Sequence, residues 1–303
     1  MELSNDTVAV VTGAGSGIGL AIADALARRG CRLALADVQD DALAAAAEQI
    51  ANHGVEVLTS RTDVSKREDV EVLATATVER FGAVHVLCNN AGVAGAGDPW
   101  LGPIEGWEWT MGVNFWGVVH GVRSFLPHIV MSGGGHIVNT ASIAGLFPGF
   151  SPAYDASKHA VVAMTEGLFH NLRDAGLPVG VSCLCPGWVK TGIVDADRNW
   201  PDELGPRPET SAGGRISRDH VRRAIDEGMP PAVVADLVVD AVEAGRYWIF
   251  PHADFLDIAV ERFHRIADSI DPHPVEQMPG MPPRSQIMAE VMNAMLAEAD
   301  GDR

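Results

Sequence analysis

Short runs of apolar and β-branched residues alternate along the chain with longer stretches in which small, apolar and charged residues mix. The runs have the composition of buried strands and lie at residues 8–12, 32–36, 55–60, 84–88, 136–140, 179–184 and 247–250. The intervening stretches have helical length, and the clearest are residues 21–29, 41–52, 67–81 and 153–173. This alternation predicts an α/β fold, with a doubly wound parallel sheet of about seven strands and helices on both faces.

Two segments interrupt the alternation. Residues 195–231 are rich in proline, glycine and charge and have no clear period, so we predict a long loop with one short helix near residues 219–227. Such a loop is either a lid or a variable surface insertion. Beyond the last strand, residues 254–268 and 285–299 have helical character, and a proline-rich spacer separates them.

The charge of the chain excludes some partners. The sequence has 22 Lys and Arg against 40 Asp and Glu, a formal net charge of −18. A field of this sign repels phosphate backbones and anionic lipid surfaces, so we expect no nucleic-acid partner and no membrane partner. The first residues lack a basic stretch followed by an apolar one, as a secretory signal would have, and we expect a cytoplasmic protein.

The cysteines indicate neither disulfides nor a metal. All of them lie in apolar runs, where a free thiol behaves as a small hydrophobic group: Cys31, Cys88, Cys183 and Cys185. Neither they nor the histidines have the spacing of a metal site, so we predict no metal.

A glycine-rich turn follows the first predicted strand and opens the next helix, with glycines at Gly13, Gly15, Gly17 and Gly19. Glycine permits positive φ angles and a close approach of the backbone to a pyrophosphate, while the helix N-terminus supplies amide donors. The turn is therefore a candidate dinucleotide site, and it makes the predicted sheet Rossmann-type.

Asp37 stands at the end of the second predicted strand. Its carboxylate can accept hydrogen bonds from the adenosine ribose hydroxyls and would repel a 2′-phosphate, which favours NAD over NADP as the cofactor. The alternative is an ordinary helix cap or turn residue.

Tyr154 stands four residues before Lys158 within a predicted helix, in a chain that has only two tyrosines. Positions four apart share one face of a helix. An ammonium group and an oxidised nicotinamide beside the phenol would both lower its pKa towards the working pH. Tyr154 is thus a candidate general acid and base.

Ser142 follows the fifth predicted strand, so it should emerge at the same edge of the sheet as the glycine turn. A hydroxyl there can donate a hydrogen bond to an oxygen on which negative charge develops. The alternative is a cap at the strand end, a common role of serine.

Together these motifs resemble the single-domain branch of the short-chain dehydrogenase/reductase family over about residues 7–251. The matching residues are Thr12-Gly13 with Gly17 and Gly19, Asn89-Asn90-Ala91-Gly92, the set Asn114, Ser142, Tyr154 and Lys158, and the loop Pro186-Gly187-Trp188-Val189-Lys190-Thr191. The resemblance implies an NAD(H)-dependent oxidoreductase that interconverts a secondary alcohol and a ketone.

The resemblance also implies roles for individual residues. Tyr154 exchanges a proton with the substrate oxygen, Ser142 orients that oxygen, and Lys158 holds the nicotinamide ribose and lowers the tyrosine pKa. Asn114 seats a water that leads to Lys158, although a lone asparagine in a helical segment often only caps or kinks the helix. The implied cofactor contacts are Gly13, Ser16, Gly17, Ile18, Gly19, Asp37, Asp63, Val64, Asn90, Ala91, Gly92, Tyr154, Lys158, Pro186, Gly187, Val189 and Thr191.

These expectations divide the chain into two parts. Residues 1–251 form the catalytic and NAD-binding domain, with a substrate loop at about residues 192–231, and residues 252–303 form a helical C-terminal extension. The extension departs from the family pattern, and it would cover the site or contact a neighbouring subunit. The resemblance implies that helices around residues 107–131 and 153–173 pair subunits, so we expect a homodimer or homotetramer.

The residues expected to line the substrate are mostly apolar: Ala94, Ala144, Phe150 and Trp188. Such a wall favours a bulky, apolar alcohol or ketone over a sugar or a carboxylate. The alternative is that these side chains pack the loops and subunit contacts.

Two other functions remain open. A non-catalytic, NAD-sensing regulatory protein would use the fold as a binding module, although the intact Ser142, Tyr154 and Lys158 argue against it. An epimerase or dehydratase of the same superfamily usually has a larger substrate domain than residues 252–303 can build.

Overall fold

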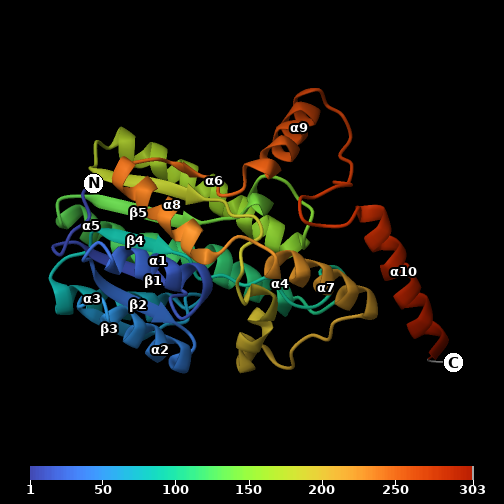
Figure 1. The fold of residues 1–303 in the computed structure, drawn as a ribbon, viewed down its shortest axis with the longest axis horizontal. Helices are drawn as coiled ribbons and strands as arrows, with labels where there is room; N and C mark the ends of the chain where they lie inside the picture. The colour runs from blue at the N-terminus through green and yellow to red at the C-terminus, as the bar shows by residue number, and fades with distance from the viewer. Residues whose placement is uncertain (302–303) are drawn as a thin grey trace.

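A parallel sheet forms the centre of the computed structural model, which describes residues 1–301 (Figure 1). Its seven strands have the order β3-β2-β1-β4-β5-β6-β7 within this described part of the chain. They are β1 (Val8–Thr12), β2 (Arg32–Asp37), β3 (Val57–Arg61), β4 (Val86–Asn89), β5 (Gly135–Thr140), β6 (Val179–Leu184) and β7 (Trp248–Ile249). The strand order reverses between β1 and β4, where open sheets of this kind bind ligands in the crevice at the carboxyl ends.

Helices connect the strands and extend the chain beyond them. They are α1 (Gly17–Ala27), α2 (Asp40–Ala51), α3 (Arg67–Phe81), α4 (Glu105–Met111), α5 (Gly117–Met131), α6 (Pro152–Asp174), α7 (Ala212–Asp226), α8 (Pro231–Ala244), α9 (Leu256–Ala267) and α10 (Arg284–Gly301). A π-helical segment, η1 (Gly112–Trp116), joins α4 to α5 without a break. The shorter turns are the 3-10 segments η2 (Ile143–Gly145), η3 (Ile193–Asn199), η4 (Asp202–Leu204) and η5 (Ala253–Phe255).

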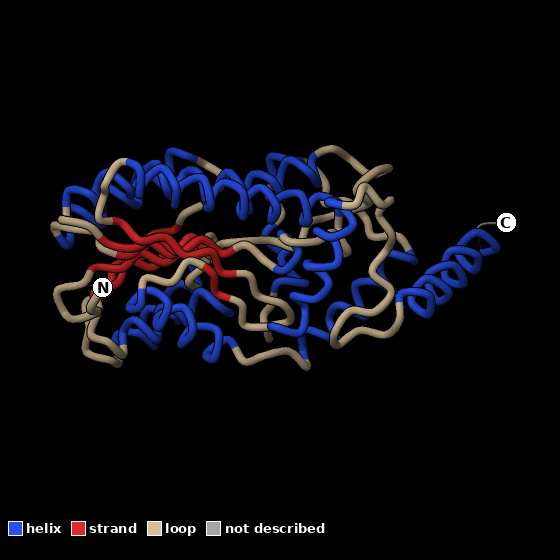
Figure 2. Tube along the Cα trace, turned by 90° about the horizontal axis from the view of Figure 1, so that it is seen from above, coloured by secondary structure: helices blue, strands red, loops and turns tan. Residues whose placement is uncertain are grey.

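The sheet is covered on both faces, as Figure 2 shows from above. Helices α1, α2 and α8 pack on one face, and α3, α5 and α6 pack on the other. Alternate residues of a strand point to opposite faces, so in β1 Ala9 and Val11 contact the first helix layer while Val8 and Val10 contact the second. All four side chains are fully buried, which explains why the strands appear in the sequence as continuous apolar runs.

The predicted fold class, a Rossmann-type parallel sheet with helices on both faces and a helical extension, is confirmed. Strand bounds differ by small amounts: β3 begins at Val57 rather than at residue 55, and β7 has two residues rather than four. The prediction for the segment after β6 is wrong in part. It contains a helix of 15 residues, α7, where one short helix near residues 219–227 was expected.

The reason for that error lies in tertiary contacts. Helix α7 is polar, but it buries Ala212, His220 and Ile225, and it packs along α10. The helix also begins at a capping residue, because Ser211 Oγ accepts a hydrogen bond from the amide of Gly214 at 3.1 Å. Most helical stability in proteins comes from packing, and a partner about 70 residues away is invisible to a local pattern.

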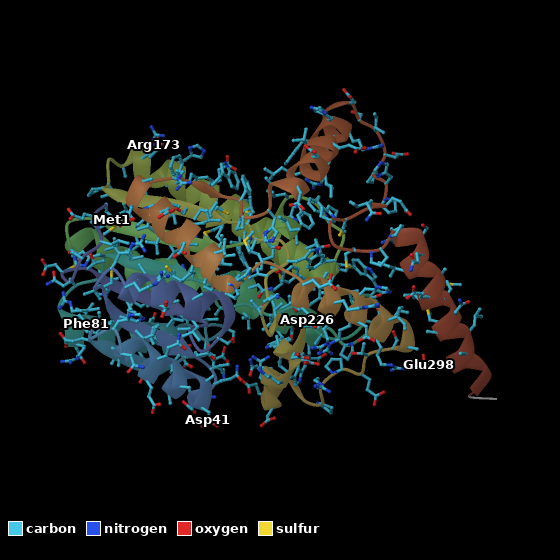
Figure 3. All side chains as sticks on the ribbon, viewed as in Figure 1. Met1, Asp41, Phe81, Arg173, Asp226 and Glu298 are labelled. Atoms are coloured by element: carbon cyan, nitrogen blue, oxygen red, sulfur yellow. The ribbon has the colours of Figure 1, made fainter. Side chains whose placement is uncertain are left out.

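The C-terminal extension has two helices with different surroundings (Figures 1 and 3). Phe255 and Ala259, at the start of α9, join a small apolar cluster with Ile143 and Phe147, which follow β5. Helix α10 stands at the far end of the molecule from Met1, and Figure 3 places Glu298 on it. There Glu298 pairs with Arg215 of α7 at 3.4 Å, and Glu290 contacts His220 at 2.7 Å. None of the described helices is both long and apolar enough to span a bilayer.

Candidate active site

The glycine turn after β1 has the backbone that the sequence predicts. Gly13 and Gly17 have φ angles of 66° and 56°, in the left-handed region that favours glycine. A side chain at Gly13 would also come within 2.9 Å of the Ala91 backbone. The turn thus brings the chain after β1 against the chain after β4, with α1 starting at Gly17.

Thr12 and Asn90 hold these two strand ends together. Thr12 Oγ1 accepts hydrogen bonds from the amides of Asn90 at 3.0 Å and Ala91 at 3.1 Å. In return, Asn90 Nδ2 donates to the Thr12 carbonyl at 3.1 Å. The Asn90-Ala91-Gly92 segment therefore lies beside the turn, in the crevice at the switch point.

Asp37 lies at the same crevice, at the end of β2. Its side chain is only 8% exposed, and its carboxylate accepts hydrogen bonds from the amides of Gly15 at 2.9 Å and Gln39 at 3.0 Å. The contact with Gln39, two residues on, is the turn role that the sequence leaves open as an alternative. The contact with Gly15 also places the carboxylate against the glycine turn.

Asp63 and Val64 follow β3, the strand that pairs with β2. Asp63 Oδ1 accepts hydrogen bonds from the Ser65 amide at 3.0 Å and from its hydroxyl at 2.7 Å. Val64 is 7% exposed, and its carbonyl contacts His120 Nδ1 of α5 at 3.0 Å. The turn after β3 is therefore fixed in place beside the end of β2.

Tyr154, Ser142 and Lys158 come together at the carboxyl edge of β5. Helix α6 begins with Pro152 at its first position, where the missing amide costs nothing, and it directs Tyr154 and Lys158 to the same side. Lys158 Nζ lies 5.7 Å from the centre of the Tyr154 ring and donates to the Thr140 carbonyl at 3.0 Å. Ser142 forms a hydrogen bond with the tyrosine and also caps η2, accepting from the Ala144 amide at 3.1 Å. The cap is the alternative role that the sequence leaves open for the serine.

Burial changes the pKa of both titratable groups. Desolvation lowers the pKa of Lys158 from 10.5 to about 8, against an opposite influence of Cys185 and Cys183. Desolvation raises the pKa of the half-buried Tyr154 to about 12, although the hydrogen bond from Ser142 opposes this. The expected lowering of the tyrosine pKa includes the oxidised nicotinamide; in the protein alone the pKa is raised, because the loss of hydration outweighs the hydrogen bond from Ser142.

Asn114 is fully buried in the π-helical segment. Its Oδ1 accepts from the Val93 amide at 2.8 Å, and its Nδ2 donates to the Val93 carbonyl at 2.9 Å and to Ser157 Oγ at 3.0 Å. The side chain therefore ties the segment after β4 to α6. A side chain on Gly92 would lie 3.2 Å from Asn114 Oδ1 and 3.5 Å from Lys158 Nζ, so both side chains lie close to Gly92.

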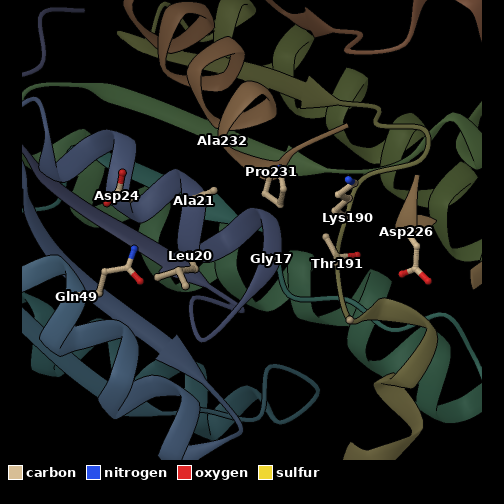
Figure 4. Close-up of a pocket in the computed structure, with 11 residues that line it drawn as sticks. Gly17, Leu20, Ala21, Asp24, Gln49, Lys190, Thr191, Asp226, Pro231 and Ala232 are labelled. Carbon is tan, nitrogen blue, oxygen red and sulfur yellow. The ribbon is translucent and has the colours of Figure 1, made fainter. Parts of the chain in front are cut away.

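The loop after β6 packs against the residues that follow β5. The Pro186 carbonyl accepts from Ser142 Oγ at 3.4 Å and from the Ile143 amide at 3.1 Å. Further along, Val189 pairs with Met229 in a short parallel bridge. Thr191 reaches the start of α1, where a side chain on Gly17 would meet its Cγ2 at 3.0 Å (Figure 4).

The residues proposed to line the substrate have different environments. Ala144 is fully buried, whereas Ala94 is partly exposed. Phe150 and Trp188 pack edge to face with ring centres 5.4 Å apart. Trp188 Nε1 also donates to the Pro279 carbonyl of the extension at 2.7 Å. Phe150 and Trp188 thus form an apolar wall that the C-terminal extension supports.

Two residues at the site have no role in the sequence-based prediction. Asp155, beside Tyr154, accepts hydrogen bonds through Oδ2 from the amides of Gly149 at 2.9 Å and Phe150 at 3.1 Å. His252 accepts at Nδ1 from the Gly187 amide at 3.1 Å, and its Nε2 lies 2.9 Å from the Trp188 carbonyl. An acidic residue in the first helical turn was the one available signal for Asp155; His252 had none, because its partners lie more than 60 residues away.

One cavity lies beside this site rather than within it. A cavity of about 610 Å³ opens between the outer face of α1 and the starts of α8 and the loop after β6, as Figure 4 shows. Its lining includes Gly17, Thr191 and Pro231 but not Tyr154. Elsewhere in the described residues, no three His, Cys, Asp or Glu side chains gather as metal ligands.

Comparison with known proteins explains this arrangement. The family model for short chain dehydrogenases matches residues 7–202. The chain belongs to the short-chain dehydrogenase family. A short-chain dehydrogenase/reductase from Burkholderia phymatum, solved in complex with NAD, is 42% identical, has a TM-score of 0.88, and the match covers 92% of this chain and 100% of that one.

Other members of the family extend the comparison. The 1-deoxy-11-beta-hydroxypentalenate dehydrogenase of Streptomyces avermitilis is 38% identical over 84% of this chain and 87% of its own length. An actinorhodin polyketide ketoreductase solved with NADPH is 31% identical with a TM-score of 0.69, and the match covers 83% of this chain and 98% of that one. Relatives of this short-chain dehydrogenase are thus found with either nicotinamide dinucleotide.

Proposed function

We propose that this short-chain dehydrogenase is an NAD(H)-dependent oxidoreductase that interconverts a secondary alcohol and a ketone on a bulky, apolar substrate. The observation that carries the proposal is the cluster of Tyr154, Ser142 and Lys158 beside the glycine turn. A phenol, a hydroxyl and a buried ammonium group at the switch point can bind, orient and exchange a proton with a substrate oxygen.

The dinucleotide fits the residues present. The positive φ angles of Gly13 and Gly17 leave the backbone at the start of α1 open to a pyrophosphate, and the N-terminal amides of α1 favour its charge. Asp37 would accept the adenosine ribose hydroxyls, Asn90 and Gly92 would line the ribose side, and Lys158 would hold the nicotinamide ribose. When bound, the nicotinamide supplies or accepts the hydride.

The protein's own residues handle the proton. In the direction of reduction, Tyr154 donates its phenolic proton to the substrate oxygen, and Ser142 donates a hydrogen bond to the same oxygen as negative charge develops there. In the direction of oxidation, the tyrosinate takes the proton from the hydroxyl. The ammonium form of Lys158 stabilises the tyrosinate in both directions.

Two choices within this proposal have specific support. Asp37 at the glycine turn supports NAD over NADP, because a buried carboxylate repels a 2′-phosphate. The apolar wall of Phe150 and Trp188 supports a bulky, apolar substrate. The Asn114 side chain would keep Val93 and α6 in register around the substrate oxygen and Lys158.

A substrate screen with a Tyr154→Phe control tests the proposal. Panels of secondary alcohols and ketones are assayed for NADH formation or consumption, in parallel with NADP(H), and NAD binding is measured separately. We expect turnover with NAD(H) and a loss of turnover of about 10²–10⁴-fold in Tyr154→Phe, with a much smaller change in NAD affinity because phenylalanine keeps the ring. Tight NAD binding without any turnover would indicate a sensor instead, and a clear preference for NADP would contradict the role of Asp37.

A further inference from the structure

The segment after β6 contacts residues that border the adenosine half of the proposed cofactor site. We call residues 193–204, which comprise η3 and η4, the arch. Arg198 Nε donates to Gln39 Oε1 at 3.1 Å, and Glu203 pairs with Lys66 at 2.6 Å. Gln39 follows β2 and Lys66 follows β3, so the arch is attached at both strand ends that border the proposed adenosine site.

Arg198 occupies a particular place in the arch. Its Nη1 donates to the carbonyls of Gly192 at 3.1 Å and Asp195 at 2.8 Å. Gly192 follows Thr191, which lies against Gly17 at the start of α1 (Figure 4). The guanidinium group therefore lies between the end of α1 that would bind a pyrophosphate and the residues just beyond Asp37.

Arg198 also differs from its basic neighbours in charge pairing. Arg207 and Arg218 pair with Asp197 at 3.3 and 2.9 Å, and Arg222 pairs with Asp195 at 2.6 Å. Among the side chains that the structure describes, no carboxylate lies within 4.0 Å of the Arg198 guanidinium, and its Nη2 has no acceptor. A guanidinium group with unused donors beside a proposed phosphate site matches an anion, because Arg binds phosphate with two parallel hydrogen bonds.

We propose that Arg198 binds a phosphate oxygen of the dinucleotide. This inference rests on the proposed function, since it requires that the protein bind a nicotinamide dinucleotide.

Binding measurements with fragments of the cofactor test this inference. Dissociation constants for NAD, NADP, ADP-ribose and adenosine are measured by calorimetry for the wild type and for Arg198→Ala, Arg198→Lys, Arg207→Ala and Gln39→Ala. We expect Arg198→Ala to weaken the affinity for NAD and for ADP-ribose at least tenfold and to leave the affinity for adenosine unchanged. Arg198→Lys should retain part of the affinity, and Arg207→Ala, an exposed arginine of the same segment, should bind as the wild type does.

Several outcomes would overturn the inference. Equal NAD affinity in Arg198→Ala and the wild type would show that the guanidinium does not touch the cofactor. An equal loss for adenosine, reproduced by Gln39→Ala, would show that Arg198 only attaches the arch. A loss confined to NADP would place the contact at a 2′-phosphate instead. If the wild type itself binds neither dinucleotide, the proposed function fails rather than this residue's role within it.

Discussion

Lys158 shows at the scale of one residue how function opposes stability. The residue is 3% exposed, and its ammonium group has one hydrogen-bond acceptor, the Thr140 carbonyl. The pKa of about 8 means that the folded protein holds this proton less firmly than the unfolded chain does. The buried ammonium group therefore lowers the free energy of unfolding. This loss is fully present below pH 8 and disappears as the pH rises to 10.5, the pKa of lysine in the unfolded chain.

We therefore expect Lys158→Met to be inactive but more stable at pH 7. Removing the buried charge should raise the free energy of unfolding by about 3 kcal/mol, from the shift in pKa. Loss of the hydrogen bond to Thr140 should lower it by about 1 kcal/mol. Thermal unfolding followed by circular dichroism should show a melting temperature several degrees above the wild type at pH 7, with a smaller difference at pH 10. Lys190→Met, at an exposed lysine, is the control, and a lower melting temperature for Lys158→Met at pH 7 would contradict this expectation.

Asp155 supports a prediction about substrate binding. Its carboxylate holds the backbone of Gly149 and Phe150, so Asp155→Ala should loosen one side of the apolar wall. We expect KM to rise several-fold with little change in NAD affinity, because the dinucleotide contacts lie elsewhere. Steady-state kinetics and NAD titration check this, with Asp174→Ala at the exposed end of α6 as the control. Equal loss of NAD affinity would show a general collapse of the site instead.

Whether a site residue was predictable from the sequence depends on how far along the chain its partners lie. Tyr154 and Lys158 were predictable because a four-residue spacing on a helix fixes their common side. Ser142 was predictable because it follows a strand. Asp155 and His252 were missed, and the raised pKa of Tyr154 was not foreseen, since each depends on packing among distant segments.

At the scale of elements, the π-helical segment η1 explains how one side chain can join three parts of the fold. Asn114 contacts both backbone groups of Val93 and the Ser157 hydroxyl from inside the helix. Segments of this kind occur often at functional sites. The resemblance implied a helix around residues 107–131, which the structure has as α4, η1 and α5, but it did not indicate the wider turn.

Asn114→Ala should reduce both stability and turnover. The change leaves the buried amide and carbonyl of Val93 without partners, and each such group costs about 1–3 kcal/mol. We expect a melting temperature lower by roughly 4–10 °C and a substantial fall in kcat. Calorimetry and kinetics at a temperature well below the transition separate the two effects, and unchanged turnover would exclude a role for Asn114 in the reaction.

At the scale of the whole molecule, the fold class was predictable from the alternating pattern, whereas the assembly was not. We propose a homodimer or homotetramer through α4, α5 and α6. Trp116, at the start of that helical face, is 50% exposed and stacks on His120. Trp116→Glu should shift the mass measured by light scattering towards the monomer, while Val72→Glu, on the equally accessible α3, should not. A wild-type monomer at micromolar concentration would contradict the proposal.

The buried thiols of the sheet have a consequence for measuring how this molecule opens. Cys31, Cys88, Cys183 and Cys185 are at most 1% exposed, and burial raises the pKa of Cys31 to about 11 and that of Cys88 to about 12. A thiol-specific reagent needs both access and thiolate, so it should label none of them in the native protein. Each cysteine is then labelled only when the structure around it unfolds locally. Mass spectrometry of labelled peptides would rank the surroundings of the four cysteines by local stability without any engineered probe.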